Sequence, residues 1–510
     1  MWNHGITGEP GLARFTPQLV VLQLAVILVF LPIRVQAVNN GLARVPQMGW
    51  NNWNAFACDV SETLMLDHAK IMVDTGLRDV GYNYVVLDDC WSGGRGEDGY
   101  LFPNAKKFPR GMAYVADHIH DQGMLFGMYS SAGEMTCARD EGSLDHETAD
   151  AQIWAKWGVD YLKYDNCFNR GRFGTPLISF QRYEVMWNAI NATGRPMLYS
   201  LCNWGEDSTH AWANGISNSW RMSGDVYDYF TRPDDLCSCE NAQDPMCIAP
   251  GKHCSVLNII NKLAPYADRS KPGSWADLDM LEVGNGGMTD DEYVAHFSMW
   301  AALNSPLLVG NDLRAITPSA LSILNNPAII AISQDPLAKS AIRIKRDVSV
   351  PKDEYGVGEA QVWSGKLYGG DQVVIFLNAA NEDLQMKATL EEIFIRETGK
   401  PPQAQEEWDV YDLWGNRMSD AVAQKIIDSP RSSAKILKDI GWYNATELPY
   451  KEGVERGDER LLGKKIQRLA AREALSKEVK KHSALVFRLR SPNRGARKEN
   501  LPSDDNHSEL

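Results

Sequence analysis

The sequence predicts an α/β fold, a (β/α)8 TIM barrel followed by a C-terminal antiparallel β-sandwich domain. Between about residues 44 and 335, short apolar runs alternate with amphipathic stretches, which is the pattern of parallel strands joined by helices. After about residue 335, apolar and polar residues alternate between turn residues, as in antiparallel sheets. A chain of 510 residues also exceeds what one hydrophobic core usually holds together.

The first 37 residues are predicted to be a signal peptide. Residues 19–31 form an apolar run broken only by Gln23, and residues 35–37 offer small side chains at the positions that a signal peptidase reads. This run is short for a membrane span. We therefore expect a secreted, extracellular protein that has no membrane attachment after cleavage. Arg34 lies close to the cleavage point, and an uncleaved anchor is the alternative reading.

Residues 38–335 are assigned to the barrel because eight strand candidates can be counted there. Between the first two, Ser61 can cap a helix whose apolar residues share one face, and Gly76 can end it. Eight such units in about 300 residues match a barrel of this kind. The candidates span residues 45–50, 82–88, 125–129, 161–165, 196–202, 219–225, 275–281 and 306–310.

Residues 336–490 are assigned to the sandwich, with strand candidates at 359–363, 372–377, 408–414 and 483–489. Residues 458–481 are charged and helix-prone, and they predict an inserted helix with apolar residues at helical spacing: Leu461, Leu462, Ile466 and Leu469. Residues 491–510 are polar and predict a disordered tail. The tail ends in His-Ser-Glu-Leu, which resembles a retrieval signal for the endoplasmic reticulum or arises by chance.

Composition narrows the possible partners. The formal net charge of −14 would repel phosphate backbones and anionic membrane surfaces, so neither a nucleic acid nor a membrane is expected. The 16 Trp residues offer flat apolar faces with an N–H donor, which suit the faces and hydroxyls of sugar rings. Core packing accounts for most of these rings.

Nine cysteines in an exported chain indicate disulfides, and an odd number leaves at least one thiol free. Four of them lie in one polar stretch, which predicts a loop cross-linked by two disulfides: Cys237, Cys239, Cys247 and Cys254. A zinc site is the competing reading, although His253 is the only histidine among them. Three glycosylation sequons begin at Asn191, Asn444 and Asn506.

Polar or aromatic residues close nearly every apolar run of the predicted barrel. Catalytic groups of such barrels gather at the carboxyl ends of the strands. A single carboxylate there is often only a helix cap, but carboxylates on several converging strands indicate a catalytic site. The closing residues are Trp50, Asp88, Asp89, Tyr129, Lys163, Asp165, Arg221, Asp225, Asp277 and Asp279.

This set fits the hydrolysis of a glycosidic bond, which needs two carboxyl groups beside one anomeric carbon. The sequence shows no Ser-His-Asp set, glycine-rich phosphate loop or His-rich metal spacing, so we expect no cofactor and no metal. Lys163 lies two residues before Asp165, so both side chains share a face and Lys163 would favour an ionised nucleophile. Arg221 could equally be only an ion-pair partner of Asp225.

Five segments resemble glycoside hydrolase family 27, in the manner of secreted fungal α-galactosidases. The resemblance covers about residues 40–380 and the final strand, and the run Leu-Lys-Tyr-Asp-Asn-Cys is its most specific part. The segments are residues 48–53, 87–91, 161–167, 221–225 and 275–281.

The resemblance implies that Asp165 is the nucleophile and Asp225 the general acid/base. Asp88 and Asp89 would accept hydrogen bonds from vicinal hydroxyls of galactose, and Trp50 would cover the apolar ring face. Some relatives carry an acid where Asn203 stands, in the segment that discriminates at the sugar 2-position. The implied galactose pocket consists of Trp50, Asp88, Asp89, Tyr129, Lys163, Cys167, Asn203, Trp204, Arg221 and Asp279.

The stereochemistry follows from the two strand ends. Asp165 ends the fourth predicted strand and Asp225 the sixth, so the two side chains face each other across the mouth. A separation of about 5–5.5 Å leaves no room for a water molecule between nucleophile and sugar, which requires covalent attack and net retention.

The resemblance also implies disulfides that pair Cys58 with Cys90, Cys137 with Cys167, Cys237 with Cys254, and Cys239 with Cys247. Cys202 is left over.

The sequence thus predicts a retaining exo-glycosidase that removes terminal non-reducing α-D-galactose from melibiose, raffinose-type sugars and galactomannan. An α-N-acetylgalactosaminidase is the alternative enzyme, although bulky Trp204, with Asn203 and Glu206, would crowd an acetamido group. A secreted galactose-binding protein without catalysis is the alternative class. A sandwich that acts as a carbohydrate-binding module is a third possibility, but no aromatic cluster in its sequence demands it.

Overall fold

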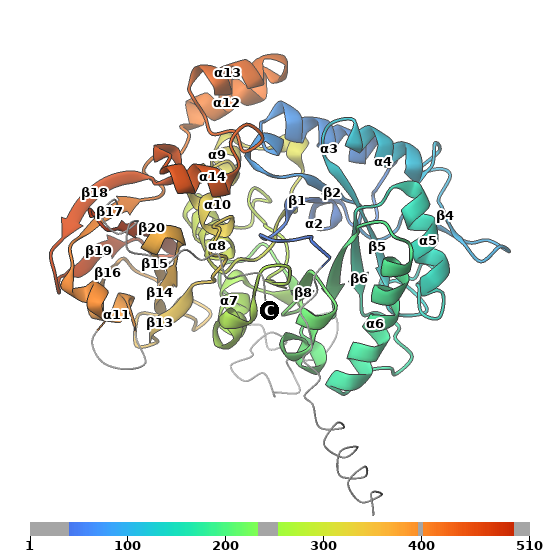
Figure 1. The fold of residues 1–510 in the computed structure, drawn as a ribbon, viewed down its shortest axis with the longest axis horizontal. Helices are drawn as coiled ribbons and strands as arrows, with labels where there is room; N and C mark the ends of the chain where they lie inside the picture. Colours follow the sequence, from blue (N-terminus) through green and yellow to red (C-terminus); the bar gives the residue numbers. More distant parts are fainter. Residues whose placement is uncertain (1–39, 233–252, 396–400, 494–510) are drawn as a thin grey trace, which may run out of the picture. The chain divides into compact units, whose positions relative to one another are not determined.

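The computed structural model describes residues 40–232, 253–395 and 401–493. Its first part contains a curved sheet of eight parallel strands, and all eight predicted strands of the barrel are confirmed (Figure 1). They are β1 (Met48–Asn51), β2 (Tyr84–Val86), β5 (Leu125–Ser131), β6 (Tyr161–Asp165), β7 (Leu198–Cys202), β8 (Ser219–Arg221), β11 (Trp275–Asp277) and β12 (Leu307–Val309).

The strands are hydrogen-bonded in the order β11-β8-β7-β6-β5-β2-β1-β12. The chain beyond β11 joins the two edges of this sheet. The backbone N–H of Leu281 donates to the carbonyl of Leu308 at 2.7 Å, and that of Gly310 donates to the carbonyl of Leu281 at 2.9 Å. These bonds make the barrel continuous and leave no open edge.

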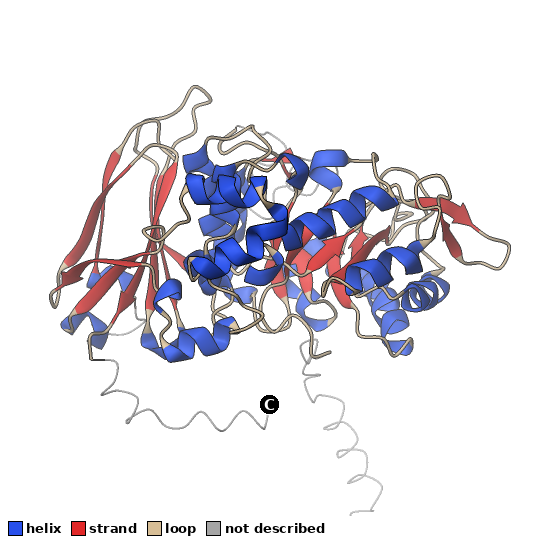
Figure 2. Ribbon diagram, turned by 90° about the horizontal axis from the view of Figure 1, so that it is seen from above, coloured by secondary structure: helices blue, strands red, loops and turns tan. Residues whose placement is uncertain are grey.

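Helices surround the strands of the barrel (Figures 1 and 2). As predicted, Ser61 caps the first long one by accepting from the N–H of Leu64, and Gly76 follows its end with a φ of 75°. The helices are α2 (Trp53–Phe56), α3 (Glu62–Asp74), α4 (Met112–His120), α5 (Glu147–Trp157), α6 (Pro176–Ala192), α7 (Val256–Leu263), α8 (Asp290–Ala302), α9 (Pro318–Leu324) and α10 (Pro327–Ser333).

Shorter elements lie between these units. Two small sheets pair β3 (Ser92–Arg95) with β4 (Leu101–Pro103), and β9 (Asp225–Val226) with β10 (His253–Cys254). The 3-10 turns are η1 (Arg78–Val80), η2 (Glu206–Ala211), η3 (Ala213–Gly215), η5 (Ala264–Arg269) and η6 (Leu313–Ala315).

The second part is an antiparallel sandwich, as predicted. A six-stranded sheet has the order β13-β14-β15-β20-β17-β18, and β16 pairs with β19 in the second sheet. Inward side chains such as Phe376, Met386, Leu475 and Phe487 form its core. The strands are β13 (Ile342–Asp347), β14 (Ala360–Lys366), β15 (Gln372–Asn378), β16 (Leu384–Thr389), β17 (Trp408–Asp412), β18 (Lys464–Leu469), β19 (Ala474–Val479) and β20 (Ser483–Arg490).

The predicted helix over residues 458–481 is wrong. Most of this stretch forms β18 and β19, and β18 is held against the neighbouring β17 by ion pairs of Lys465 and Arg468 with Asp409. Its leucines fit helical spacing only by coincidence. The remaining short elements are α11 (Leu390–Ile393), α12 (Asp420–Asp428), α13 (Ser433–Asp439), α14 (Tyr450–Arg456), η7 (Tyr368–Gly370), η8 (Pro402–Gln405), η9 (Pro430–Ser432) and η10 (Glu459–Leu461).

A helical insertion does exist, but it lies upstream of the predicted one. Residues 413–463 leave the sandwich after β17 and contact the barrel before they return to β18. The hydroxyl of Tyr450 donates to the carbonyl of Val80 at 3.1 Å, and the indole N–H of Trp442 donates to Asn325 at 2.7 Å. The insertion therefore stabilises the pairing of the two domains.

Two of the implied disulfides, Cys58–Cys90 and Cys137–Cys167, are present, and Cys202 is a buried free thiol. Cys254 is disulfide-bonded. The other expectations for this loop, Cys237, Cys239 and Cys247, lie outside the described residues, as do the signal peptide, Asn506 and the tail from residue 494. Within the described ranges, no helix combines the length and apolarity needed to cross a bilayer.

Candidate active site

Strand register brings the predicted catalytic residues to one end of the barrel. Along β5, β6 and β7, Tyr129 lies beside Lys163, and Asp165 lies beside Cys202. On β8, Arg221 pairs in register with Asp277 of β11. Because side chains alternate along a strand, Lys163 and Asp165 point into the barrel together, as the sequence predicted.

Asp165 lies in a nearly closed environment, with 6% of its surface exposed. One carboxylate oxygen accepts a hydrogen bond from the Tyr129 hydroxyl at 2.9 Å, and the other accepts from the backbone N–H of Asn166 at 2.8 Å. Burial raises the pKa of Asp165 to about 7, and the charge of Asp225 adds to the increase. Lys163 lowers the pKa, as expected, but burial outweighs it.

Lys163 forms an ion pair with Asp88 at 2.8 Å, and the same carboxylate oxygen accepts from the side-chain amide of Asn51 at 2.8 Å. Burial disfavours the charge of Lys163, but the surrounding carboxylates, Asp88 above all, raise its pKa well above its usual value. Lys163 is therefore a permanent cation in the floor of the site.

Arg221 holds the opposite wall. Its guanidinium contacts Asp225 and Asp279, each at 3.0 Å, and reaches the sulfur of Cys202 at 3.5 Å. Asp279 also accepts from the backbone N–H of Val226 at 2.8 Å. The Asp225 side chain is 39% exposed, in contrast to the buried Asp165, so the two carboxyls meet different amounts of water.

Asp89 and Cys167 contribute to the loops around the mouth. The carboxylate of Asp89 accepts from the backbone N–H groups of Cys90 and Ala138, at 2.7 and 2.8 Å. Cys167 is joined to Cys137, and its carbonyl accepts from the Ser131 hydroxyl at 2.9 Å. These bonds hold the loop at residues 136–138 against the strand of Asp165.

The prediction that Trp50 covers a sugar ring needs correction. Trp50 is fully buried on the outer side of β1, where its ring stacks on His68 of α3 at 4.2 Å between centroids. Alternation explains this orientation, because Asn51, the next residue, points into the barrel. Trp53 is partly exposed and packs against the cluster that contains Met280, which lines the site cavity, so it is the candidate for covering the sugar ring that the sequence reasoning missed.

The loop after β7 contains the residues expected at the sugar 2-position. The amide of Asn203 is used inside the loop, where it donates to the carbonyl of Glu206 and accepts from Thr209. Trp204, which has a φ of 58°, is half-buried. The Asn203 amide is thus engaged within the loop, which leaves Trp204 as the candidate of this loop for a sugar contact.

Glu206 connects this loop to the nucleophile. Its carboxylate accepts from the side-chain amide of Asn166 at 2.7 Å, and the oxygen of that amide accepts from Arg182 at 2.5 Å. Burial raises the pKa of Glu206 to about 7. The amide of Asn166 is thus fixed on both sides, and its backbone N–H orients Asp165.

A small cavity in the barrel floor collects further residues beneath these groups. The sequence reasoning missed Asn51, Ser200 and Met280 there, although strand alternation could have indicated Ser200, which lies two residues before Cys202 on β7. The lining consists of Asn51, Tyr161, Lys163, Ser200, Cys202, Arg221, Asp277, Asp279, Met280 and Leu308.

In the part of the chain that the structure describes, one trio of potential metal ligands is close enough to share an ion: Cys137, Asp165 and Cys167. The two cysteines are bonded to each other, so their sulfurs are not thiolate ligands.

Comparison with protein families gives two matches. A family described as alpha galactosidase A matches residues 45–335, and one described as alpha galactosidase C-terminal beta sandwich domain matches residues 357–437.

Individual relatives agree. The chain is 52% identical over 451 residues to an α-galactosidase of Zygotorulaspora mrakii, which covers 88% of this chain and 95% of that protein. It is 51% identical to α-galactosidase 6 of Saccharomyces cerevisiae over 88% of this chain and 94% of that protein.

Two solved structures of an α-galactosidase from Saccharomyces cerevisiae are each 50% identical to this chain. The first gives a TM-score of 0.86 and covers 89% of this chain and 100% of its own. The second, with raffinose, gives a TM-score of 0.85 and covers 89% of this chain and 99% of its own. The α-galactosidase I of Mortierella vinacea gives a TM-score of 0.74 at 41% identity, with 89% and 99% covered.

Proposed function

Because the chain belongs to the α-galactosidase family of glycoside hydrolases, we propose that it removes terminal α-galactose with net retention, with Asp165 as nucleophile and Asp225 as general acid/base. The observation that carries this assignment is the difference in environment between the two carboxyls. Asp165 is buried against Tyr129, whereas Asp225 is 39% exposed at the mouth. A group that exchanges protons with water must reach water, and a nucleophile need not.

In the first step, Asp165 attacks the anomeric carbon in its carboxylate form, which Lys163, the N–H of Asn166 and the Tyr129 hydroxyl favour against the effect of burial, while Asp225 gives its proton to the glycosidic oxygen. The bond to the leaving alcohol breaks, and a galactosyl ester forms on Asp165. In the second step, Asp225 takes a proton from water as the water attacks the same carbon and releases Asp165. Two inversions at one carbon give net retention.

The neighbouring residues support each role. Tyr129 and the N–H of Asn166 hold the two oxygens of Asp165, which fixes the direction of attack. Arg221 holds Asp225 with one terminal guanidinium nitrogen and Asp279 with the other. We assign sugar hydroxyls to Asp88, Lys163 and Asp279, because these buried polar groups converge on the same end of the barrel.

The test of the mechanism is proton NMR of the first product. With 4-nitrophenyl α-galactoside as substrate, we expect α-galactose to appear first and the β-anomer to follow only by mutarotation. An early β-anomer would mean an inverting mechanism and a different pair of residues.

The range of substrates is tested by assays on a set of galactosides and an α-N-acetylgalactosaminide. We infer that melibiose, raffinose-type sugars and galactomannan are hydrolysed and that α-N-acetylgalactosaminides are not, because Trp204 is expected at the 2-position and would crowd an acetamido group. Turnover of an α-N-acetylgalactosaminide at a rate within tenfold of the galactoside would overturn this inference.

Secretion belongs to the same proposal. The apolar N-terminal run, two disulfides and the exposed sequon at Asn191 support export and glycosylation. Mass spectrometry of protein from the culture medium should find a chain that begins near residue 38 and carries glycans at Asn191 and Asn444.

A further inference from the structure

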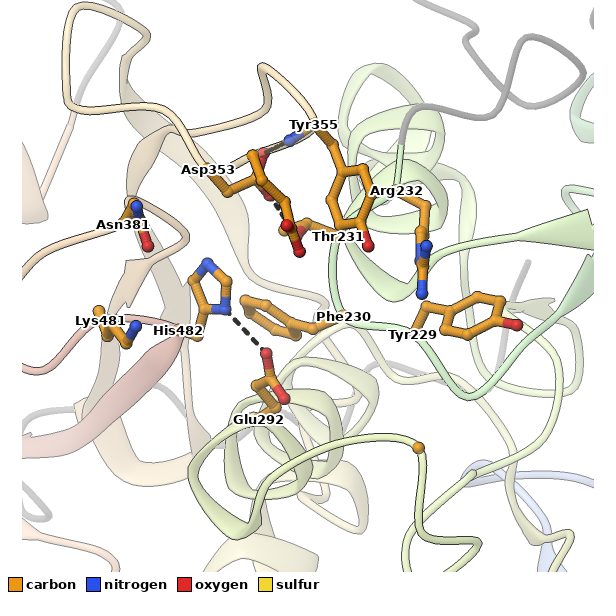
Figure 3. Close-up of a pocket in the computed structure, with 12 residues that line it drawn as sticks. Tyr229, Phe230, Thr231, Arg232, Glu292, Asp353, Tyr355, Asn381, Lys481 and His482 are labelled. Atoms are coloured by element: carbon orange, nitrogen blue, oxygen red, sulfur yellow. Dashed lines mark hydrogen bonds and ion pairs between the residues drawn. The ribbon is translucent and has the colours of Figure 1, made fainter.

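A cavity of about 450 Å³ shares no lining residue with the predicted galactose pocket (Figure 3). One wall is the segment at residues 229–232, which follows Asp225 in the chain, with Glu292 of α8 beside it. The other wall comes from the sandwich, from residues 353–355, Asn381 and residues 481–482. This volume is in the range of small-ligand sites.

Aromatic rings form one side of the cavity. The guanidinium of Arg232 lies 4.4 Å from the ring centre of Tyr229 and 4.6 Å from that of Tyr355. These cation–π contacts fix the two rings, which remain 39% and 38% exposed. Fixed tyrosine rings with open surface suit the C–H faces of sugars, and their hydroxyls remain available to hydrogen-bond.

Polar side chains on the other side of the cavity have hydrogen-bonding groups that are not used within the described residues. His482 bonds to Glu292 through Nδ1 at 2.8 Å, and its Nε2 is buried without a hydrogen-bond partner among the described residues. Asn381, Glu354 and Lys481 have no side-chain partner within the described ranges, and Asn381 and Lys481 stand at the rim in Figure 3. Together these side chains offer both hydrogen-bond donors and hydrogen-bond acceptors.

The charges of the lining are mixed. Arg232 and Lys481 are cationic, while Glu292, Asp353 and Glu354 are anionic. This mixture gives no advantage to a strongly charged ligand of either sign. A neutral, polyhydroxylated ligand fits the rings and the unpaired polar groups together.

A short run of chain connects the cavity to the proposed acid/base, Asp225. The acid/base stands beside the glycosidic oxygen, so the part of the substrate beyond the galactose begins at Asp225. Tyr227 follows two residues later, is 43% exposed, and contacts the ring of Tyr229 edge-on at 5.9 Å. Exposed tyrosines therefore extend from the acid/base to the cavity.

We propose that this cavity is an accessory subsite for a neutral sugar unit of the saccharide chain that carries the galactose, which makes polymeric galactomannan a preferred substrate. The proposal rests on the proposed α-galactosidase function. The sandwich contributes half of the subsite, so it takes part in substrate binding through this face.

The test compares long and short substrates in the full-length protein. Tyr355→Ala and Asn381→Ala remove contacts from the cavity, and Phe102→Ala on β4 is the matched control, since it removes another exposed aromatic ring, 46% exposed. The kcat and KM are measured with galactomannan and with 4-nitrophenyl α-galactoside. Native gels cast with and without galactomannan report binding independently of turnover.

We expect the two cavity variants to raise KM for galactomannan by about three- to tenfold, in line with the loss of one ring or one hydrogen-bonding group. Their values for the nitrophenyl substrate and the behaviour of Phe102→Ala should stay within about twofold of wild type. Unchanged galactomannan kinetics, or equal losses on both substrates, would overturn the subsite. A wild-type protein inactive on the nitrophenyl substrate would instead refute the proposed function, and the gels would still test the cavity.

Discussion

Glu282 should make the protein less stable as the pH rises. Its carboxyl is 3% exposed and accepts from the side-chain amides of Asn54 and Asn285. Burial raises its pKa from 4.5 to about 8. The folded protein therefore holds this proton more tightly than the unfolded chain does. The stabilisation is complete below the unfolded pKa and is lost as the pH rises towards 8.

The magnitude follows from the two pKa values. They differ by about 3.5, and each pKa unit corresponds to about 1.4 kcal/mol, so the full effect is about 4–5 kcal/mol. Between pH 5 and pH 7.5, a range of about 2.5 pH units, the contribution of Glu282 to the free energy of unfolding falls by about 3 kcal/mol. Glu282→Gln keeps the size of the side chain and one acceptor, but it does not titrate.

The assay is urea unfolding followed by tryptophan fluorescence at pH 5, 6, 7 and 7.5, after a check that unfolding is reversible. The stability of Glu282→Gln should rise relative to wild type by about 3 kcal/mol across this range. Glu97→Gln, at an exposed position, is the control and should run parallel to wild type. If the curve of Glu282→Gln also runs parallel, Glu282 is not protonated in the folded protein and the argument fails.

Substitutions at three positions and one chemical treatment test the site and the fold further. Asp165→Ala should bind galactose by calorimetry yet lose nearly all turnover, and normal activity in the folded variant would disprove its role. Asp225→Asn should lose at least about 100-fold on melibiose but less on the nitrophenyl substrate, whose leaving group needs little protonation; equal losses would contradict the acid role. Glu206→Ala should lower kcat about tenfold with KM little changed, and Glu206→Gln should restore it, whereas a shared loss of melting temperature would indicate a merely structural role. Reduction of the Cys58–Cys90 and Cys137–Cys167 bridges should cost about 2–4 kcal/mol each in unfolding free energy, and an unchanged stability with both thiol pairs titrated would refute this.

Strand alternation explains both the success and the main error of the sequence reasoning at the site. The run Tyr161–Asp165 has a clear period of two, so the shared face of Lys163 and Asp165 was predictable. In β1 the same reasoning stopped at the end of the apolar run and chose Trp50, although the strand continues to Asn51. Neighbouring side chains of a strand point to opposite faces, so the choice of Trp50 instead of Asn51 placed the expected sugar contact on a residue that faces the outside of the barrel.

Contacts between distant segments could not be predicted from the sequence. The pKa of Asp165 depends on burial, and burial depends on loops that come from several strands. The apolar residues Leu461, Leu462, Ile466 and Leu469 satisfy a helical spacing, and only pairing with the distant β17, including the ion pairs with Asp409, favours a strand. Glu206 gave no signal beyond its position near Trp204, because its partner Asn166 lies on another strand's loop.

The insertion at residues 413–463 limits how this enzyme can be recombined with its relatives. Tyr450 and Trp442 meet Val80 and Asn325, so a surface encoded late in the gene matches one encoded far earlier. A chimera that crosses over near residue 336 would inherit the two halves of this contact from different parents. Productive exchanges should therefore carry the insertion together with the barrel that it contacts, or leave both in place.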